Sequence, residues 1–283
     1  MPARIPDGEL LRWLEEDAPS GDRTSEALGI GAVPGHAVLC AGAPMVAACV
    51  EDAARLLELA GCRASVHLRS GAQAAENAKL ITADGPAGDL HRALPAVVAL
   101  LEHASGIATV AAGIVAAARR GGERATVAAT RRHAPGLRML AMAAAEAGGI
   151  MPFRAGVSDG IVVAPGHVAF FGSDSALASA LARLRRAAPT ARAVVVACGV
   201  EQAMALAESG VGSVQLDRAP PDVVAQVAAA LDRLRYRPLL VVAGGIHAGN
   251  AAAYAASGAD VLLTSAQFQA PPRPIKLRIA RAR

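Results

Sequence analysis

Six short apolar runs, separated by windows with helical periodicity, fill the second half of the chain. The runs lie at Ala125–Ala129, Ile161–Val163, Ala193–Ala197, Ser213–Leu216, Leu239–Ala243 and Val261–Leu263. Strands that alternate with helices are typical of parallel βα units. The pattern leaves two architectures open, a barrel-like sheet and a doubly wound sheet.

The first half has a different pattern, in which strands follow one another with few helices between them. Residues 8–17 have the apolar spacing of a short helix, and residues 36–50 predict one or two strands. A helix is expected at Glu51–Ala60, followed by strands within residues 64–70 and 77–85. This succession predicts a small α+β domain.

A long helical stretch connects the two halves. We expect a helix over residues 87–120, interrupted near Pro95 and again at Ser105–Thr109. Residues 275–279 alternate apolar and charged side chains, which predicts a half-buried strand that could rejoin the sheet of the first half.

Composition and charge narrow the class of protein. Of the 283 residues, 53% are hydrophobic and only 2% are aromatic, so Ala, Val and Leu must fill the interior. The net charge is +4, and five positive charges lie in the last eleven residues. With few aromatic residues and no apolar run near the ~20 residues of a membrane span, we expect a cytoplasmic protein without nucleic-acid or membrane partners.

The cysteines and one serine motif do not predict chemistry. The four cysteines lack the CxxC spacing of a zinc site and are expected to be reduced core residues. The stretch GVSDG at 156–160 matches the G-x-S-x-G motif of hydrolases, but no buried strand precedes it and no helix follows it.

A glycine-rich stretch near the end predicts a phosphate site. An apolar strand ends at Ala243 and continues into Gly244 and Gly245, and a helix is expected to begin near His247. The next strand ends with three further candidates, Thr264, Ser265 and Ala266. Two such loops hold phosphates in many barrels, although glycines also serve tight turns alone.

Arginines gather after the first strand of the second half. Arg131 or Arg132 could hold a carboxylate or phosphate with two hydrogen bonds, and Arg138 follows about one helical turn later. Arg154 is a fourth candidate, from the next loop. The alternative is that these arginines are solvated, as most loop arginines are.

Asp217 follows an apolar strand and should lie at the same edge of the sheet. Its carboxylate could bind Mg²⁺ or a ribose hydroxyl, or it could cap the helix that follows. His167 is interpreted as a structural histidine.

Six ordered motifs, spanning nearly the whole chain, resemble the quinolinate phosphoribosyltransferase family, also called nicotinate-nucleotide pyrophosphorylases. They are EDAPSGDRT (16–24), EHASGIAT (102–109), TRRHAPGLR (130–138), FRAGVSD (153–159), QLDR (215–218) and the stretch at 243–266. QLDR and the closing APPRPIKLRI are most similar to the ModD branch, whose pyrophosphorylases are associated with molybdenum transport.

The resemblance implies a fold and an assembly. It implies an α/β protein with a small N-terminal sandwich domain at residues 1–108, which residues 273–283 could rejoin. An open β/α barrel, similar to a TIM barrel, would occupy residues 109–272. The implied assembly is a homodimer.

The resemblance also implies a reaction. Phosphoribosyl pyrophosphate, with Mg²⁺, would lose pyrophosphate as a ring nitrogen attacks the anomeric carbon. The matching residues include Arg131 and Arg154 at the acid-binding positions and Asp217 at the ribose or metal position. Asp217 and Arg132 are the expected catalytic residues. The expected phosphate and substrate ligands also include Arg138, Ala243, Gly244, Gly245, Thr264, Ser265 and Ala266.

Five positions depart from the family pattern. The expected lysine of the first arginine motif is Arg132, and an expected histidine is Phe153. An expected lysine is Ala164, a glutamate is Val196, and an arginine contributed across the dimer is Pro95. Quinolinate is therefore a poor guess for the acceptor. Two hypotheses follow: a phosphoribosyltransferase with another acceptor, or a phosphate-binding accessory or sensor protein that has lost turnover.

Overall fold

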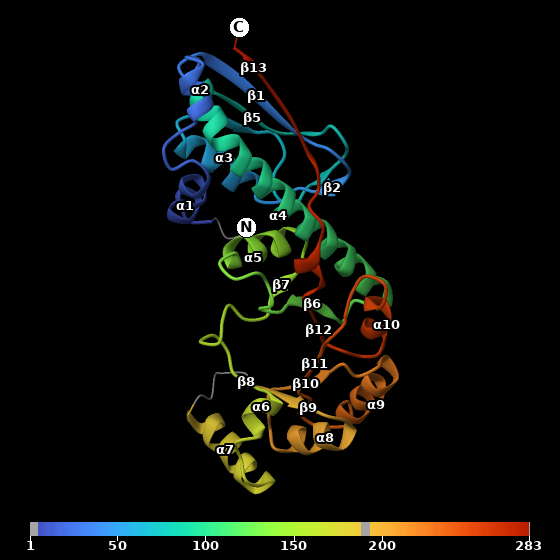
Figure 1. Ribbon diagram of the computed structural model, residues 1–283. Coiled ribbons are helices and arrows are strands. Elements are labelled where there is room, and N and C mark those ends of the chain that lie inside the picture. Colours follow the sequence, from blue (N-terminus) through green and yellow to red (C-terminus); the bar gives the residue numbers. More distant parts are fainter. Residues whose placement is uncertain (1–4, 188–192, 283) are drawn as a thin grey trace. The chain divides into compact units, whose positions relative to one another are not determined.

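The computed structural model describes residues 5–187 and 193–282, and the chain divides into two compact units (Figure 1). Unit 1 is built from three segments, Met1–Ala112, His133–Ile150 and Gln267–Arg283. Unit 2 is built from Gly113–Arg132 and Met151–Ala266. The chain therefore leaves unit 1 twice and returns to it twice.

Unit 1 contains a sheet, a small two-stranded sheet and the helices that pack on them. Its helices are α1 (Asp7–Asp17), α2 (Arg23–Ala27), α3 (Val50–Leu59), the first part of α4 (Ala87–Gly121) and α5 (Arg138–Ala147). Its strands are β1 (Pro34–Ala41), β2 (Met45–Val46), β3 (Arg63–Val66), β4 (Gln73–Ala74), β5 (Lys79–Pro86) and β13 (Ile275–Arg281). A 3-10 helix, η1 (Ala266–Gln269), precedes β13.

The larger sheet of unit 1 has the order β13-β1-β5-β3 and is antiparallel throughout. Along β1, Ala37, Leu39 and Ala41 are buried, and the residues between them are more exposed. This period of two places alternate side chains on the core face. The C-terminal strand β13 pairs with β1 along its whole length, with Leu277 opposite Leu39.

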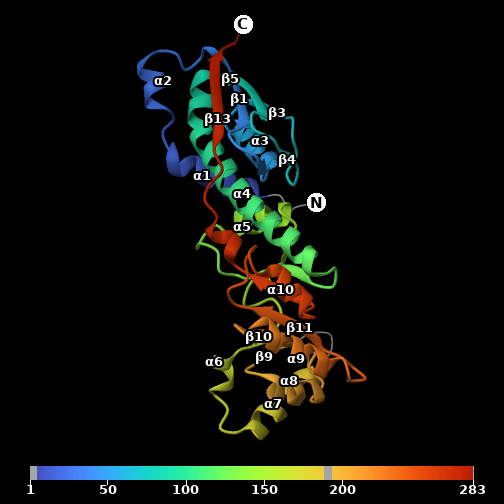
Figure 2. The ribbon, with the colours of Figure 1, turned by 90° about the vertical axis from the view of Figure 1, so that its right-hand side faces the viewer.

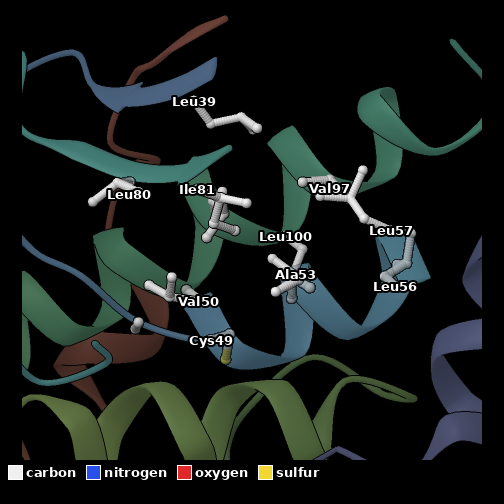
Figure 3. Close-up of a cluster of buried hydrophobic side chains, with 14 of the residues drawn as sticks. Leu39, Cys49, Val50, Ala53, Leu56, Leu57, Leu80, Ile81, Val97 and Leu100 are labelled. Carbon is white, nitrogen blue, oxygen red and sulfur yellow. The ribbon is translucent and has the colours of Figure 1, made fainter. Parts of the chain in front are cut away.

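Helices α3 and α4 cover the core face of this sheet, and α5 lies beyond α3 (Figure 3). Leu39 and Ile81 extend from the sheet toward Val97 and Leu100 of α4, and all four side chains are almost fully buried. The small side chain of Ala53 lets α3 approach this cluster closely. The sequence predicted this α+β packing from the strand succession alone.

The long helix α4 is continuous, so the predicted interruptions at Pro95 and Ser105–Thr109 were wrong. Pro95 is exposed, and water can satisfy the carbonyl that its missing N–H leaves free. Gly106 is required by a close approach, because a Cβ there would lie 2.4 Å from the Pro271 carbonyl oxygen. Residues that weaken an isolated helix are therefore accommodated by tertiary structure.

By length and composition alone, α4 is also the one helix in the described chain that could cross a membrane. However, 56% of its most apolar window is buried inside the protein. Leu94, Val97 and Leu101 of this helix belong to the core of unit 1. Core helices of this kind pass the same length and hydropathy test.

Three of the four cysteines match the predicted core positions. All four are free thiols; Cys49 and Cys62 are buried and Cys40 is partly buried. Burial, together with the nearby Asp89, raises the pKa of Cys62 to about 11, so its thiol stays protonated. Cys198 is exposed after a strand of unit 2, so the prediction of a core position was wrong there.

Unit 2 alternates strands and helices, as the apolar runs predicted. Its strands are β6 (Thr126–Ala129), β7 (Met151–Pro152), β8 (Val162–Val163), β9 (Val194–Ala197), β10 (Ser213–Asp217), β11 (Leu239–Ala243) and β12 (Val261–Thr264). Its helices are the end of α4, α6 (Pro165–Val168), α7 (Asp174–Ala187), α8 (Val200–Glu208), α9 (Pro221–Leu231) and α10 (Ala251–Ala256). The two-residue strand β7 had no apolar run to predict it.

The strands of unit 2 form one parallel sheet with the order β7-β6-β12-β11-β10-β9-β8 (Figure 1). Figure 2 shows β9, β10 and β11 of this sheet with α8 and α9 beside them. Strands that follow one another in sequence are neighbours, and β12 returns to pair with β6. This cyclic order is that of a barrel and excludes the doubly wound alternative. The barrel is open between β7 and β8, which are not paired in the described part of the chain.

One face of each strand points into the barrel. Residues paired in register point to the same side of a parallel sheet. Ala128, Val194, Val241, Ala243 and Leu263 form an interior cluster, with Phe153, Val162 and Val261 packed against it. Most of these side chains are alanine or valine, which are smaller than the leucines of the unit 1 core.

A network of charges joins the amino ends of three barrel strands. Asp260, which precedes β12, accepts hydrogen bonds from the Arg124 side chain at 2.8 Å and from the backbone N–H of Leu240 at 2.7 Å. Arg237 donates to Asp260 and to Asp232, and also to the Gly258 carbonyl. We call these four charged residues, Arg124, Asp232, Arg237 and Asp260, the basal network.

Candidate functional site

The candidate site lies at the carboxyl ends of the barrel strands in unit 2. Thr264 of β12 is in register with Ala129 of β6, and Asp217 of β10 is in register with Ala243 of β11. Backbone hydrogen bonds continue past the strand ends, from Thr130 N–H to the Thr264 carbonyl and from Arg218 N–H to the Ala243 carbonyl, at 2.9 and 2.8 Å. The loops that carry the predicted residues therefore start from one rim.

Two of the predicted arginines form a pair of like charges, which we call the arginine pair. Arg131 follows β6, Arg154 follows β7, and both are partly buried. Burial first, and then the positive charge of Arg131, lower the pKa of Arg154, while Asp159 acts in the opposite direction. Two arginines that follow neighbouring strands at one rim favour an anion between them.

Asp159, whose charge raises the pKa of Arg154, accepts a hydrogen bond within its own loop. Its Oδ2 accepts a hydrogen bond of 2.7 Å from the backbone N–H of Ala155. This bond fixes the turn that presents Arg154. GVSDG is thus a loop that positions an arginine, with neither the preceding strand nor the following helix of a nucleophile elbow.

The other two predicted arginines differ in position. Arg132 is exposed beside Arg131, and its backbone N–H donates to Thr130 Oγ1 at 3.2 Å. Arg138 begins α5 and is exposed in unit 1. His133 also belongs to unit 1, where its ring contacts Phe268 edge-on with 5.9 Å between the ring centroids.

The glycine loop, Gly244–Gly249, follows β11. Gly244 and Gly245 have φ values of +93° and +77°, a conformation that other residues rarely adopt. Their backbone N–H groups donate no hydrogen bond to another residue described by the structure. Asn250 closes the loop, because its side chain donates to the Gly245 carbonyl and accepts from His247 N–H.

The helix after this loop begins later than predicted. It starts at Ala251 and not near His247, and it has six residues. So short a helix contributes little to anion binding through its dipole. The two glycine amides are therefore the main donors that this loop offers.

Thr264 supports the glycine loop. It is buried, and its hydroxyl donates to the Ile246 carbonyl at 2.6 Å and accepts from Ala266 N–H at 3.1 Å. Ser265 and Ala266 are partly buried beside it. Ala243 is buried in the interior cluster below the loop. In this group, Thr264 and Ala243 hold the rim in shape, and Ser265 keeps a hydroxyl at its surface.

Asp217 is exposed at the end of β10, on the interior-facing row with Ala243. It does not cap α9, because that helix begins after Pro220 without a side-chain cap. Gly244 provides the space for it, since a Cβ there would lie 2.9 Å from Asp217 Oδ1 and 2.6 Å from Arg218 Cγ. Arg218 itself has a φ of +55°, so the turn that presents Asp217 is strained.

Two of the residues that depart from the family pattern, Phe153 and Val196, face the same interior. Phe153 packs against the interior cluster, and Ala164 follows β8 at the start of α6. The backbone N–H of Ala164 donates to His167 Nδ1 at 3.0 Å, which fits the structural role predicted for that histidine. Val196 is buried in β9. Pro95 lies in unit 1.

One polar residue of this interior was missed by the sequence analysis. Gln215 lies in β10, two positions before Asp217 and therefore on the same face, and it is only 9% exposed. It is in register with Val196 on one side and Val241 on the other. The available signal was a glutamine at the centre of an otherwise apolar strand, within the motif QLDR.

No preformed metal centre is found among the residues that the structure describes, in the sense of three or more histidine, cysteine or acidic side chains that converge. Asp217 offers an exposed carboxylate at the end of β10. This donor set suits Mg²⁺, which is commonly held by one or two carboxylates together with substrate phosphates and water.

Two family models match the chain. The N-terminal domain of quinolinate phosphoribosyl transferase matches residues 22–105, and the C-terminal domain matches residues 107–278. A protein of Rhodobacter capsulatus named "Putative pyrophosphorylase ModD" is 40% identical over 248 residues, which cover 88% of this chain and 95% of that protein.

The human nicotinate-nucleotide pyrophosphorylase is more distant. It is 30% identical over 261 residues, which cover 92% of this chain and 86% of that protein. The crystal structure of NadC from Streptococcus pyogenes superimposes with a TM-score of 0.89 at 22% identity, covering 98% of this chain and 97% of that one. The two structures share the fold predicted from the sequence, a small sheet domain followed by an open barrel.

Proposed function

Because this chain belongs to the quinolinate phosphoribosyltransferase family, we propose that it is a phosphoribosyltransferase of the ModD type. Its donor would be phosphoribosyl pyrophosphate, and its acceptor an anionic nitrogen heterocycle. A link to molybdenum transport is part of this proposal through the resemblance to the ModD branch.

The observation that carries the proposal is the arginine pair. Arg131 and Arg154 come from neighbouring loops and are close enough for one charge to lower the pKa of the other. Holding like charges together is unfavourable unless a ligand offsets it. An acceptor carboxylate between the two guanidinium groups would do so, with the glycine loop across the rim available for the donor's phosphate.

The proposed reaction is the displacement of pyrophosphate by the ring nitrogen of the acceptor. A lone pair of the acceptor ring nitrogen forms the new C–N bond at the anomeric carbon, and the C–O bond to pyrophosphate breaks. The departing pyrophosphate keeps that electron pair. Arg132, which is exposed on the rim, would stabilise this negative charge, and Asp217 would face the positive charge that develops on the ribose.

Mg²⁺ would bind this site together with phosphoribosyl pyrophosphate. Asp217 would hold it together with the phosphates of phosphoribosyl pyrophosphate. When bound, the ion neutralises phosphate charge and orients the leaving group. Gly244 leaves the carboxylate free to face the rim.

A second candidate function is ligand binding without turnover. It is favoured by the side chains at positions 153, 164 and 196, which are Phe, Ala and Val and cannot ionise. Such a protein would bind a phosphorylated ligand as an accessory or sensor protein. It shares the phosphate-binding prediction with the first candidate and differs in releasing no pyrophosphate.

We also propose that the protein is a homodimer. A groove of about 880 Å³ within unit 1 supports this, because it is lined by apolar side chains that include Trp13, Ile107, Leu137 and Phe268. Leu137 and the neighbouring Met139 are exposed. Such apolar surface is commonly covered by a partner. Light scattering should give twice the mass of the chain.

The proposal is tested by ligand-induced stabilisation and by pyrophosphate release. Phosphoribosyl pyrophosphate with Mg²⁺ should raise the melting temperature, by the mass action expected of any ligand specific for the folded state. Asp217→Asn should remove the Mg²⁺-dependent part of this shift. Asp222→Asn, an exposed aspartate in the first turn of α9, is the matched control and should keep it.

The assay of pyrophosphate release across heteroaromatic acids and bases then separates the two candidates. Release with one acceptor, but negligible release with quinolinate, supports the transferase. Binding without release from any of them supports the accessory protein. Absence of a thermal shift at millimolar phosphoribosyl pyrophosphate contradicts both.

A further inference from the structure

We infer that Gln215 selects the acceptor: its amide recognises a neutral edge of the heterocycle that carries one N–H donor and one C=O acceptor, such as a lactam or carboxamide. This inference rests on the proposed function and specifies its substrate class. The expected acceptor is thus a monoanionic heterocycle whose charge is bound by the arginine pair and whose uncharged edge is bound by Gln215.

The first observation is that the amide of Gln215 has no partner in the protein and is open to the barrel space. The residue is 9% exposed, and its side chain makes no hydrogen bond to another residue within 5–187 or 193–282. Its amide atoms are not among the fully enclosed polar atoms that lack a partner, so part of the small exposed fraction belongs to the amide. A ligand inside the barrel can therefore reach the amide without displacing a protein partner.

The second observation is its place in the barrel. Gln215 and Asp217 lie on the same face of β10, with their Cα atoms separated by about 6.6 Å, which is two residues of extended strand. Asp217 is at the rim, so Gln215 belongs to the interior layer directly beneath it. A ring held at the rim by its anionic group would extend toward this layer.

The third observation is that the neighbours of Gln215 leave it no competing partner. Val196 and Val241 flank it in register, and Ala243 is the next interior residue along β11. None of these side chains can donate or accept a hydrogen bond. The amide is therefore the polar group that this part of the barrel wall offers to a ligand.

The chemistry of the amide defines the ligand edge. A carboxamide presents one acceptor oxygen beside one donor nitrogen, so it pairs through two hydrogen bonds with a lactam or a second carboxamide. Two carboxylates on one ring would place a negative charge against a neutral oxygen. The site should therefore prefer a single carboxylate with a neutral edge over a dicarboxylate.

The test uses a matched pair of ligands and the full-length chain. Nicotinate and 5-carbamoylpyridine-3-carboxylate are both monoanions, both keep the pyridine nitrogen free, and differ only in the carboxamide. Their dissociation constants are measured by calorimetry without phosphoribosyl pyrophosphate, so that no turnover occurs. Wild type should bind the carboxamide acid about tenfold more tightly or better, since a site built for a hydrogen bond rejects an analogue that lacks it.

Gln215→Met should reduce the ratio of the two dissociation constants to about one. It should also leave the melting temperature within about 2 °C of the wild-type value, because the amide has no protein partner to lose. A structural role for the side chain would lower the melting temperature instead. Gln226→Leu, an exposed glutamine on α9, is the matched control and should change neither quantity.

Gln215→Glu keeps the length of the side chain but removes its N–H donor, so it should lower the same ratio and serves if the methionine variant does not fold. A ratio that is the same in wild type and both variants, with an intact thermal shift from phosphoribosyl pyrophosphate, overturns this inference alone. The absence of that thermal shift in wild type overturns the proposed function and the inference with it.

Discussion

The two ends of the barrel in unit 2 differ in how their charged side chains are paired. At the amino ends of the strands, the basal network pairs each charge with an opposite one. Asp260 is only 12% exposed and accepts hydrogen bonds from two arginines and a backbone N–H. At the carboxyl ends, the charge of Arg131 lowers the pKa of Arg154, and Asp217 is exposed at the rim without an ion-pair partner in the described part of the chain.

This difference suggests that the two ends of one sheet contribute to stability unequally. Paired charges at the amino ends connect the starts of β6, β11 and β12. At the carboxyl ends the charge of Arg131 disfavours that of Arg154, so under the proposed function this pair serves an anionic ligand. Barrel enzymes commonly show this division, with the active site at the carboxyl ends.

The largest effect should come from breaking the basal network. Asp260→Ala removes the acceptor for Arg124, Arg237 and Leu240 N–H, and leaves the mostly buried Arg237 without its main partner. Breaking a buried pair in this way should lower the free energy of unfolding by about 3 kcal/mol. Denaturation in urea measures it.

Asp232→Ala provides the control within the same network. Asp232 is half exposed, so its removal should cost less than about 1 kcal/mol. Equal losses in the two variants would contradict the distinction between the buried and the exposed carboxylate. The thermal shift produced by phosphoribosyl pyrophosphate should persist in both variants.

A smaller effect should appear as the pH falls. Burial raises the pKa of Asp260, but the hydrogen bonds from Arg237, Leu240 N–H and Arg124 outweigh it, and the net pKa is lowered. Its contribution to stability is therefore complete above the unfolded-state pKa of about 4 and is lost as the pH falls through the folded-state value. The stability gap between wild type and Asp260→Asn, measured by urea denaturation, should stay constant from neutral pH down to about 5 and then close. A gap that persists to the lowest pH at which the protein folds would argue against this account.

The smallest effect on stability should come from the opposite end. Arg154→Met removes a charge that burial and Arg131 disfavour, so the free energy of unfolding should change by less than about 0.5 kcal/mol. Binding should change much more, with the dissociation constant of nicotinate rising about tenfold or more in calorimetry. Arg233→Met, an exposed arginine after α9, should alter neither value. If Arg154→Met lowered the free energy of unfolding without changing nicotinate binding, the carboxyl end would have a structural role and the prediction would be contradicted.

The fold was largely predictable because its strands are apolar runs bounded by turns. Each of the six apolar runs of the second half forms a barrel strand whose bounds differ from the predicted ones by at most one residue. The errors came where tertiary contacts override local preference. Pro95 lies inside α4, and Gly106 allows the backbone near Pro271 to approach the same helix.

The site was predictable in part. The ends of strands locate the rim, so Arg131, Arg154, Asp217 and Gly244 could be assigned to it from the sequence. Hydrogen bonding could not be foreseen: the Thr264 hydroxyl supports the glycine loop. Gln215 was missed because a single polar residue in an apolar strand becomes meaningful only when its face, burial and missing partner are known.

The pairing of β13 with β1 has a consequence for biosynthesis. The sheet of unit 1 combines strands made early in translation with a strand from residues 275–281, which emerges after every strand of the barrel. Until then β1 has an unpaired edge, and such an edge invites aggregation. A nascent chain stalled within the barrel would carry this exposed edge, so its need for chaperones should end when the last strand leaves the ribosome.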